Sequence, residues 1–119
     1  MKTTKRHFKL FKKECQKWID VFELNNWKVN FERGGTNTDA YSTIRTKIGG
    51  YVATISFAED WYMGGVDNIK ESIQETAKHE MIHLLLARFS NYAESKHFTT
   101  GDLLEAEEEL VRKLTKIIK

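Results

Sequence analysis

The chain of 119 residues has one cysteine, no proline and only seven glycines. A single cysteine cannot form an intrachain disulfide or a cysteine-only zinc site, and it suits a reducing compartment. No apolar run approaches the roughly 18 residues that cross a bilayer, and the basic start MKTTKRHFKLFKK lacks the apolar stretch of a signal peptide. These absences lead us to expect a cytoplasmic protein with no membrane partner.

The sequence also lacks a strong excess of charge of either sign. Nineteen basic residues against seventeen acidic residues give a formal net charge of +2, so the chain as a whole offers no general attraction for nucleic acid or acidic surfaces. It has no repeat, no low-complexity tract and no linker-like stretch, and its length suits one domain. We therefore expect residues 1–119 to form a single domain, and we expect a monomer.

Hydrophobic patterns in the first half of the chain predict one helix followed by three strands. Apolar residues at intervals of three and four predict an amphipathic helix over 8–22. Alternating residues predict a half-buried strand over 27–32, and β-branched and aromatic residues predict strands over 41–48 and 51–58. A glycine pair between the last two strands favours a tight hairpin.

Two further helices are predicted in the second half. Asn68 and Glu71 have the spacing of a capping box, which begins a long helix that ends near residue 90. Asp102 and Glu105 are predicted to begin a final helix that ends near residue 118. The whole order predicts an α+β fold, with a helix layer on one face of a small, mainly antiparallel sheet of about three strands.

Residues 79–83 read HEMIH, which matches H-E-x-x-H inside the long predicted helix. Side chains four residues apart project from one helix face, so His79 and His83 can each offer a nitrogen to one metal ion. Glu80 lies beside that face, which suits a base that acts on metal-bound water. The helix is apolar nearly all round, so we expect it to be buried and its histidines to need a partner such as a metal. The simpler alternative is that the two histidines cap a helix face and Glu80 is a solvated charge. Satisfied core histidines are the other alternative to a metal site.

A third ligand must come from another part of the chain, because catalytic zinc sites normally have three protein ligands and a water. A metzincin would have its third histidine at position 89, which is phenylalanine here. On a helical projection of the last helix, Glu107 falls inside the apolar face, where a carboxylate is costly unless it is paired or bound to metal. Glu107 is therefore our candidate; Glu108, if the helix is rotated, and His97, in the preceding loop, are its rivals.

The chain resembles the HExxH zinc metallopeptidases, in particular the compact gluzincin-like and SprT-like members found among small phage and bacterial proteins. The similarity rests on HEMIHLLLARF, on EAEEELVRKL, and on the upstream order of a helix, LNNWKVNFE and a strand hairpin. It implies a minimal zincin-like domain that hydrolyses peptide bonds, with Zn²⁺ on His79, His83 and a downstream Glu, and with Glu80 as general base and proton shuttle. It also implies that an extended peptide or protein substrate pairs with the strand at 51–58. If the chain is phage-encoded, it would act in the host cytoplasm.

Two parts of this expected site stay open. Gluzincins commonly have an acid four residues after the ligand Glu, which orients a zinc histidine, but Val111 stands at that position. The tetrahedral oxyanion also needs a hydrogen-bond donor. Tyr41, Tyr62, Tyr92 and His97 are candidates, and the sequence does not choose among them.

Two other classes of function compete with a peptidase. One is weak association with DNA through the basic first helix, although a solvated helix face explains its charges more simply. The basic residues concerned are Lys2, Lys5, Arg6, Lys9, Lys12, Lys13 and Lys17. The other is a non-catalytic zinc-containing binding module. Glu80 argues against that module, because a structural zinc site closes with a fourth protein ligand and has no use for an acid beside a water.

Overall fold

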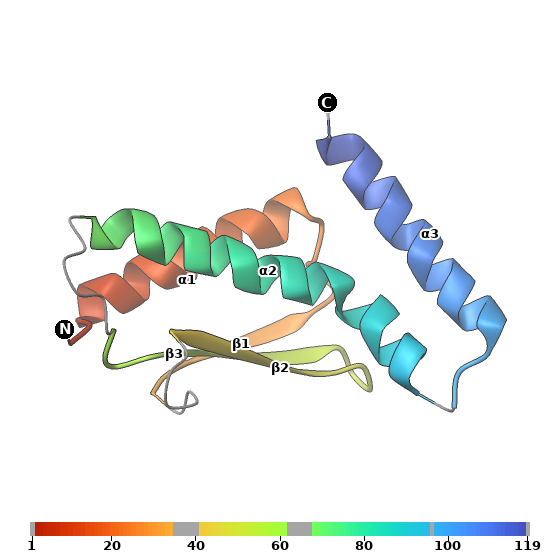
Figure 1. The fold of residues 1–119 in the computed structure, drawn as a ribbon, viewed down its shortest axis with the longest axis horizontal. Coiled ribbons are helices and arrows are strands. Elements are labelled where there is room, and N and C mark those ends of the chain that lie inside the picture. Colours follow the sequence, from red (N-terminus) through yellow and green to blue (C-terminus); the bar gives the residue numbers. More distant parts are fainter. Residues whose placement is uncertain (1, 35–40, 62–67, 96, 119) are drawn as a thin grey trace.

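Figure 1 shows the fold in a computed structural model, which describes residues 2–34, 41–61, 68–95 and 97–118. The elements follow the order α1 (Lys5–Val21), β1 (Lys28–Arg33), β2 (Ser42–Lys47), β3 (Val52–Phe57), α2 (Ile69–Glu94) and α3 (Thr100–Ile117). The α+β class and the three strands are confirmed. None of the helices within the described ranges is long and apolar enough to cross a membrane.

Helix α1 forms because its start is capped and one of its faces is apolar. The Thr4 side chain accepts a hydrogen bond from the backbone N–H of His7 at 3.2 Å, and His7 Nδ1 accepts one from the Thr4 N–H at 3.1 Å. One turn after another, Phe11, Cys15 and Ile19 are buried, as the periodicity predicts. Cys15 is therefore a core residue, and burial raises the pKa of its thiol above the ordinary range.

The sheet is mixed, with the strand order β1-β3-β2. Strand β2 runs antiparallel to β3, whereas β1 runs parallel to it. The expectation of a mainly antiparallel sheet is therefore wrong for one of the two strand pairs. Residues Ala53, Ile55 and Phe57 of β3 are completely buried, which is consistent with its place at the centre of the sheet.

The β2–β3 hairpin turns over four residues, 48–51, rather than over a glycine pair alone. The last paired residues are Lys47 and Val52, and the backbone N–H of Tyr51 donates to the Ile48 carbonyl at 3.1 Å. Gly50 has φ of +82°, a conformation that costs glycine little. The glycine signal for a turn is thus confirmed.

Helices α1 and α2 lie side by side on one face of the sheet, and α3 lies to one side (Figure 1). Aromatic rings fill the space between the helices and the sheet. The ring centroids of Phe11 and Phe57 are 4.9 Å apart, and those of Phe57 and Trp61 are 5.4 Å apart. This cluster ties α1 to the central strand and to the segment that follows it.

The last two helices differ from their predicted bounds at one end each. Helix α2 begins after Asn68, whose side chain accepts from the Glu71 N–H as expected, but it continues to Glu94. Helix α3 begins one residue after Thr99, which forms a capping box with Asp102. The prediction made Asp102 the first residue of the capping box. In the structure Thr99 has that place, and Asp102 is the acid of the box.

We predict that Phe11→Ala lowers the free energy of unfolding by about 3–5 kcal/mol, because a fully buried ring would leave a cavity beside Phe57. Urea unfolding followed by circular dichroism measures the change. The control Val21→Ala, at a side chain that is 41% exposed, should change it by less than about 0.5 kcal/mol. Equal losses in the two variants would contradict the assignment of the core.

Candidate metal centre

Helix α2 is buried along one side only. Its buried residues are Ile73, Ala77, Glu80, Met81, Leu84, Leu85 and Ala87. On the opposite side His79 and His83 are exposed, and Ile82 and Leu86 are 40% and 36% exposed. The expectation that this helix is buried all round is therefore wrong. Its apolar residues exceed what α1 and one face of a three-stranded sheet can cover.

The two histidines nevertheless converge. Their Nε2 atoms are 3.2 Å apart, and their rings stand at 78° to one another. Two nitrogens that each lie about 2.0–2.1 Å from a tetrahedral zinc ion are themselves about 3.3–3.4 Å apart. One turn of helix thus presents two nitrogens at nearly the separation that one metal ion requires. Their exposure also excludes the alternative of satisfied core histidines.

A groove runs between α2 and β2, with the histidines on its α2 side. It consists of two adjoining hollows of about 550 Å³ and 470 Å³, which share Ser42, His79 and Glu80. One hollow continues along β2 and is also lined by Thr43, Ile44, Arg45 and His83. The other is also lined by Tyr41, Ser72, Glu75 and Thr76. The groove therefore extends to both sides of the histidine pair.

Glu80 lies in the floor of this groove. Its side chain lines both hollows, although the residue is only 6% exposed. Burial raises the pKa of its carboxyl from the ordinary value of 4.5 to about 7. A carboxyl with that pKa can take up and release a proton near neutral pH, as a general base must. Glu80 is therefore not the solvated charge of the simpler alternative.

The strand beside the histidines is β2, so the prediction that a peptide pairs with residues 51–58 is wrong. Strand β3 occupies the centre of the sheet, and both of its edges are already paired. The Ala58 N–H donates to the Tyr41 carbonyl, so these two residues form a hydrogen-bonded pair. In an antiparallel ladder such pairs recur at every second residue, so Thr43, Arg45 and Lys47 of β2 also bond to β3. The backbone groups of Ser42, Ile44 and Thr46 consequently point away from β3, along the outer edge of β2.

Glu107 does not join the histidines in this structure. It is exposed, because α3 turns Ala106 and Leu110 toward the protein instead. Arg88 of α2 pairs with Glu105 and Glu109, which flank Glu107, so these three acids lie level with Arg88. Arg88 is five residues beyond His83, which places it about 7.5 Å along the helix and about 140° around it. The prediction that Glu107 faces the core is wrong, because Ala106 and Leu110 occupy the buried side of α3.

The two alternative third ligands, Glu108 and His97, are also not grouped with His79 and His83. Glu108 is exposed on α3, and His97 is exposed in the loop, where its backbone N–H donates to the Ser95 side chain at 3.1 Å. Within the described ranges, no three His, Cys, Asp or Glu side chains are grouped so that they could hold a metal ion. The residues present thus fit the part of a zinc site that one helix supplies, and they do not complete it.

Among the candidate oxyanion donors, Tyr41 lines the groove, where its ring stacks on Trp61. Tyr92 accepts a hydrogen bond from Arg88 at 3.3 Å, and it lies about 13 Å along α2 from His83. Neither Tyr92 nor His97 lines the groove. Tyr62 lies outside the described residues.

Sequence reasoning missed several residues of the groove, notably Ser42, Arg45 and Glu75. Ser42 and Arg45 belong to β2, and no local pattern shows which strand will lie beside the histidines. Glu75 had a signal, because it precedes His79 by one helical turn. Comparison of the chain with family models, with curated proteins and with solved structures finds no match.

The raised pKa of Glu80 predicts a stability difference from Glu80→Gln in the metal-free protein. Between pH 4.5 and about 7 the folded chain binds more protons at Glu80 than the unfolded chain, so its free energy of unfolding falls as the pH rises. Relative to Glu80→Gln, whose side chain stays neutral, the wild type should lose up to about 3 kcal/mol across this range.

Urea unfolding of both proteins in EDTA, at half-unit steps of pH, measures this difference. Groups that titrate in both proteins cancel, so the difference reports Glu80 alone. A constant difference between pH 4.5 and 8 would show that the carboxyl titrates normally.

Proposed function

We propose that this chain is a zinc-dependent peptidase. The observation that supports it best is the convergence of the His79 and His83 nitrogens, 3.2 Å apart, on a groove whose floor contains the buried carboxyl of Glu80. Metal donors, a proton acceptor and a binding groove occur in one place. The H-E-x-x-H spacing alone predicts the first two of these features, and the groove adds room for a substrate.

In the proposed mechanism His79 and His83 hold the metal through Nε2. Bound zinc would supply a Lewis acid that polarises the carbonyl of the peptide bond and makes water more acidic. Glu80 accepts a proton from the attacking water, and it returns that proton to the leaving amine. Glu80 lines both hollows of the groove next to the two histidines, which places its carboxyl where both transfers would occur.

We further propose that β2 binds the substrate. Along its outer edge, Ser42, Ile44 and Thr46 present N–H and C=O groups that an extended peptide can pair with. The same strand lines the groove next to the histidines. A peptide added there as a further strand would carry its backbone past His79, His83 and Glu80.

The competing functions have weaker support. A structural zinc site has four protein ligands, whereas the described residues bring together two nitrogens beside an acid that lines a groove. The basic residues of α1 are exposed, as in the simpler explanation of a solvated face. Phe11 points into the core, so it is not free to stack on a base.

Replacing Glu80 by Gln should lower the turnover of a peptide substrate about 10²–10⁴-fold, because the variant lacks the proton acceptor. Zinc content should be unchanged, since Glu80 is not one of the proposed zinc ligands. Cleavage of a quenched fluorescent peptide library and elemental analysis measure the two quantities. The control Glu94→Gln, at an exposed position at the end of α2, should retain both. Wild-type activity in Glu80→Gln would refute the proposed mechanism.

Ile44→Pro tests the role of the β2 edge. Its N–H points away from β3, so proline removes a group offered to the substrate while the ladder to β3 is kept. We expect kcat/KM to fall up to about tenfold, the value of one hydrogen bond. Ile44→Ala controls for loss of the side chain. Arg45→Pro removes an N–H that bonds to β3, so it should destabilise the fold. Equal kcat/KM for Ile44→Pro and Ile44→Ala would argue against pairing at this edge.

A further inference from the structure

Helix α2 presents an exposed stripe that contains the two histidines. Its members, at positions i, i+3, i+4 and i+7, are His79, Ile82, His83 and Leu86. All four are exposed, and they lie on one face because this spacing follows the helical repeat. Two large apolar side chains lie beside the two imidazoles, and the exposure of this apolar surface to water is unfavourable.

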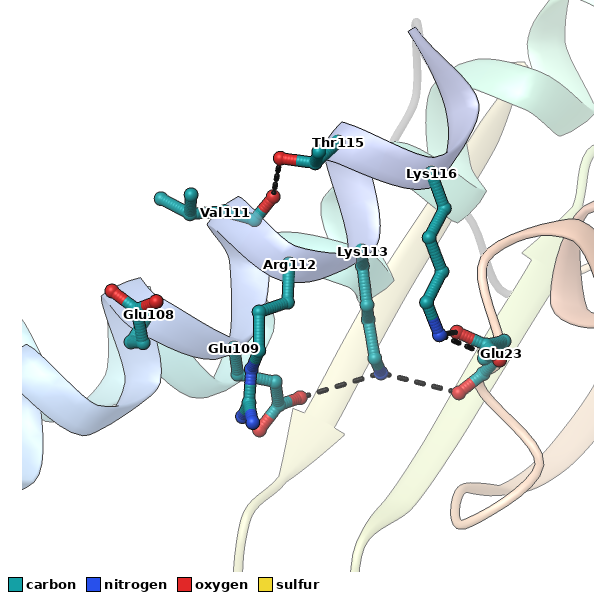
Figure 2. A pocket seen from close by; sticks show the side chains of 8 residues that line it. All are labelled: Glu23, Glu108, Glu109, Val111, Arg112, Lys113, Thr115 and Lys116. Carbon is teal, nitrogen blue, oxygen red and sulfur yellow. Dashed lines mark hydrogen bonds and ion pairs between the residues drawn. The ribbon is translucent and has the colours of Figure 1, made fainter.

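Helix α3 presents a second exposed stripe with the same spacing. Its members, again at i, i+3, i+4 and i+7, are Leu104, Glu107, Glu108 and Val111. Leu104 and Val111 are 59% and 49% exposed. In Figure 2, Lys113 and Lys116 point toward Glu23, whereas Glu108 and Val111 extend from α3 in another direction; all five residues line the same hollow.

The two stripes complement one another in chemistry. Each has two apolar and two polar side chains, with the polar residues at i and i+4 on α2 and at i+3 and i+4 on α3. The polar members are imidazoles on α2 and carboxylates on α3, and these are the ligand types that zinc combines in catalytic sites. The α2 stripe lacks a third ligand, and the α3 stripe offers two candidates.

Within one chain the stripes are held apart. Arg88 ties α3 to the side of α2 opposite His79 through Glu105 and Glu109. At the other end, Lys116 pairs with Glu23 at 3.1 Å, and Lys113 donates to the Glu23 carbonyl (Figure 2). Glu109 also pairs with Lys113 at 3.3 Å. To reach its own histidines, α3 would have to break all of these interactions and move around α2.

We propose that a second copy of this chain completes the metal site, its α3 stripe packing on the α2 stripe of the first. In a twofold dimer the α3 stripe of each chain packs on the α2 stripe of the other, so two equivalent sites form. Glu107 or Glu108 of the second copy supplies the third ligand to His79 and His83. This dimer replaces the monomer expected from the sequence, and it rests on the part of the proposed function in which the histidines bind zinc.

The first test measures zinc content and molecular mass together. Wild type should be monomeric in EDTA, and with zinc it should become a dimer that holds about one ion per chain, by elemental analysis and sedimentation velocity. Leu104→Lys/Val111→Lys should abolish the dimer and most of the zinc while all ligands remain. Val21→Lys, at another exposed apolar residue, is the control and should behave as wild type.

The second test is complementation between two variants that each lack half of the site. His79→Ala/His83→Ala keeps the carboxylates, and Glu107→Gln/Glu108→Gln keeps the imidazoles. Neither should retain zinc alone, whereas an equal mixture should bind about one ion per two chains, since one complete site forms in each mixed dimer.

Two results would overturn the inference: a zinc-loaded wild type that stays monomeric, or a mixture that binds no more zinc than its parts. Neither outcome would contradict the proposed peptidase function, because movement of α3 within one chain would also bring Glu107 or Glu108 to the histidines. A wild type that binds no zinc would instead overturn the proposed function together with the inference.

Discussion

The rotational setting of helix α2 is the constraint on which the rest of the structure depends. Ile73, Ala77 and Met81 face the core and are completely buried, and Leu84 continues the same side. This setting leaves no freedom for the intervening residues. His79 and His83 must face the solvent, and Glu80, about 100° around the helix from His79, must enter the groove beside β2. Core packing thus separates two exposed metal donors from one buried acid on a single turn.

This separation gives each residue of the motif a different environment. The imidazoles of His79 and His83 are exposed to solvent. The carboxyl of Glu80 is shielded from water, and its pKa rises toward 7 because its charged form loses hydration. Glu80 therefore gives up some folding stability near neutral pH. A pKa shift of this kind occurs often in catalytic sites, so it supports the role proposed for Glu80.

The helices, the strands and the H-E-x-x-H turn could be predicted because each depends on local periodicity. Asn68 and Asp102 carried signals for the helix starts, although the cap of α3 lies at Thr99. The order of the strands could not be predicted, since the long-range pairing of β1 with β3 leaves no local pattern in the sequence. The sequence also does not show which face of α3 is buried. The choice of face depends on long-range contacts, since Ala106 and Leu110 are buried and Arg88 pairs with Glu105 and Glu109, while Glu107 is exposed.

We propose that His79 and His83 hold one zinc ion between them. X-ray absorption at the zinc edge of the loaded protein tests this binding. We expect two imidazole nitrogens at about 2.0–2.1 Å, with oxygen ligands in the remaining positions. A spectrum without imidazole scattering, or one unaltered by His83→Ala, would contradict it.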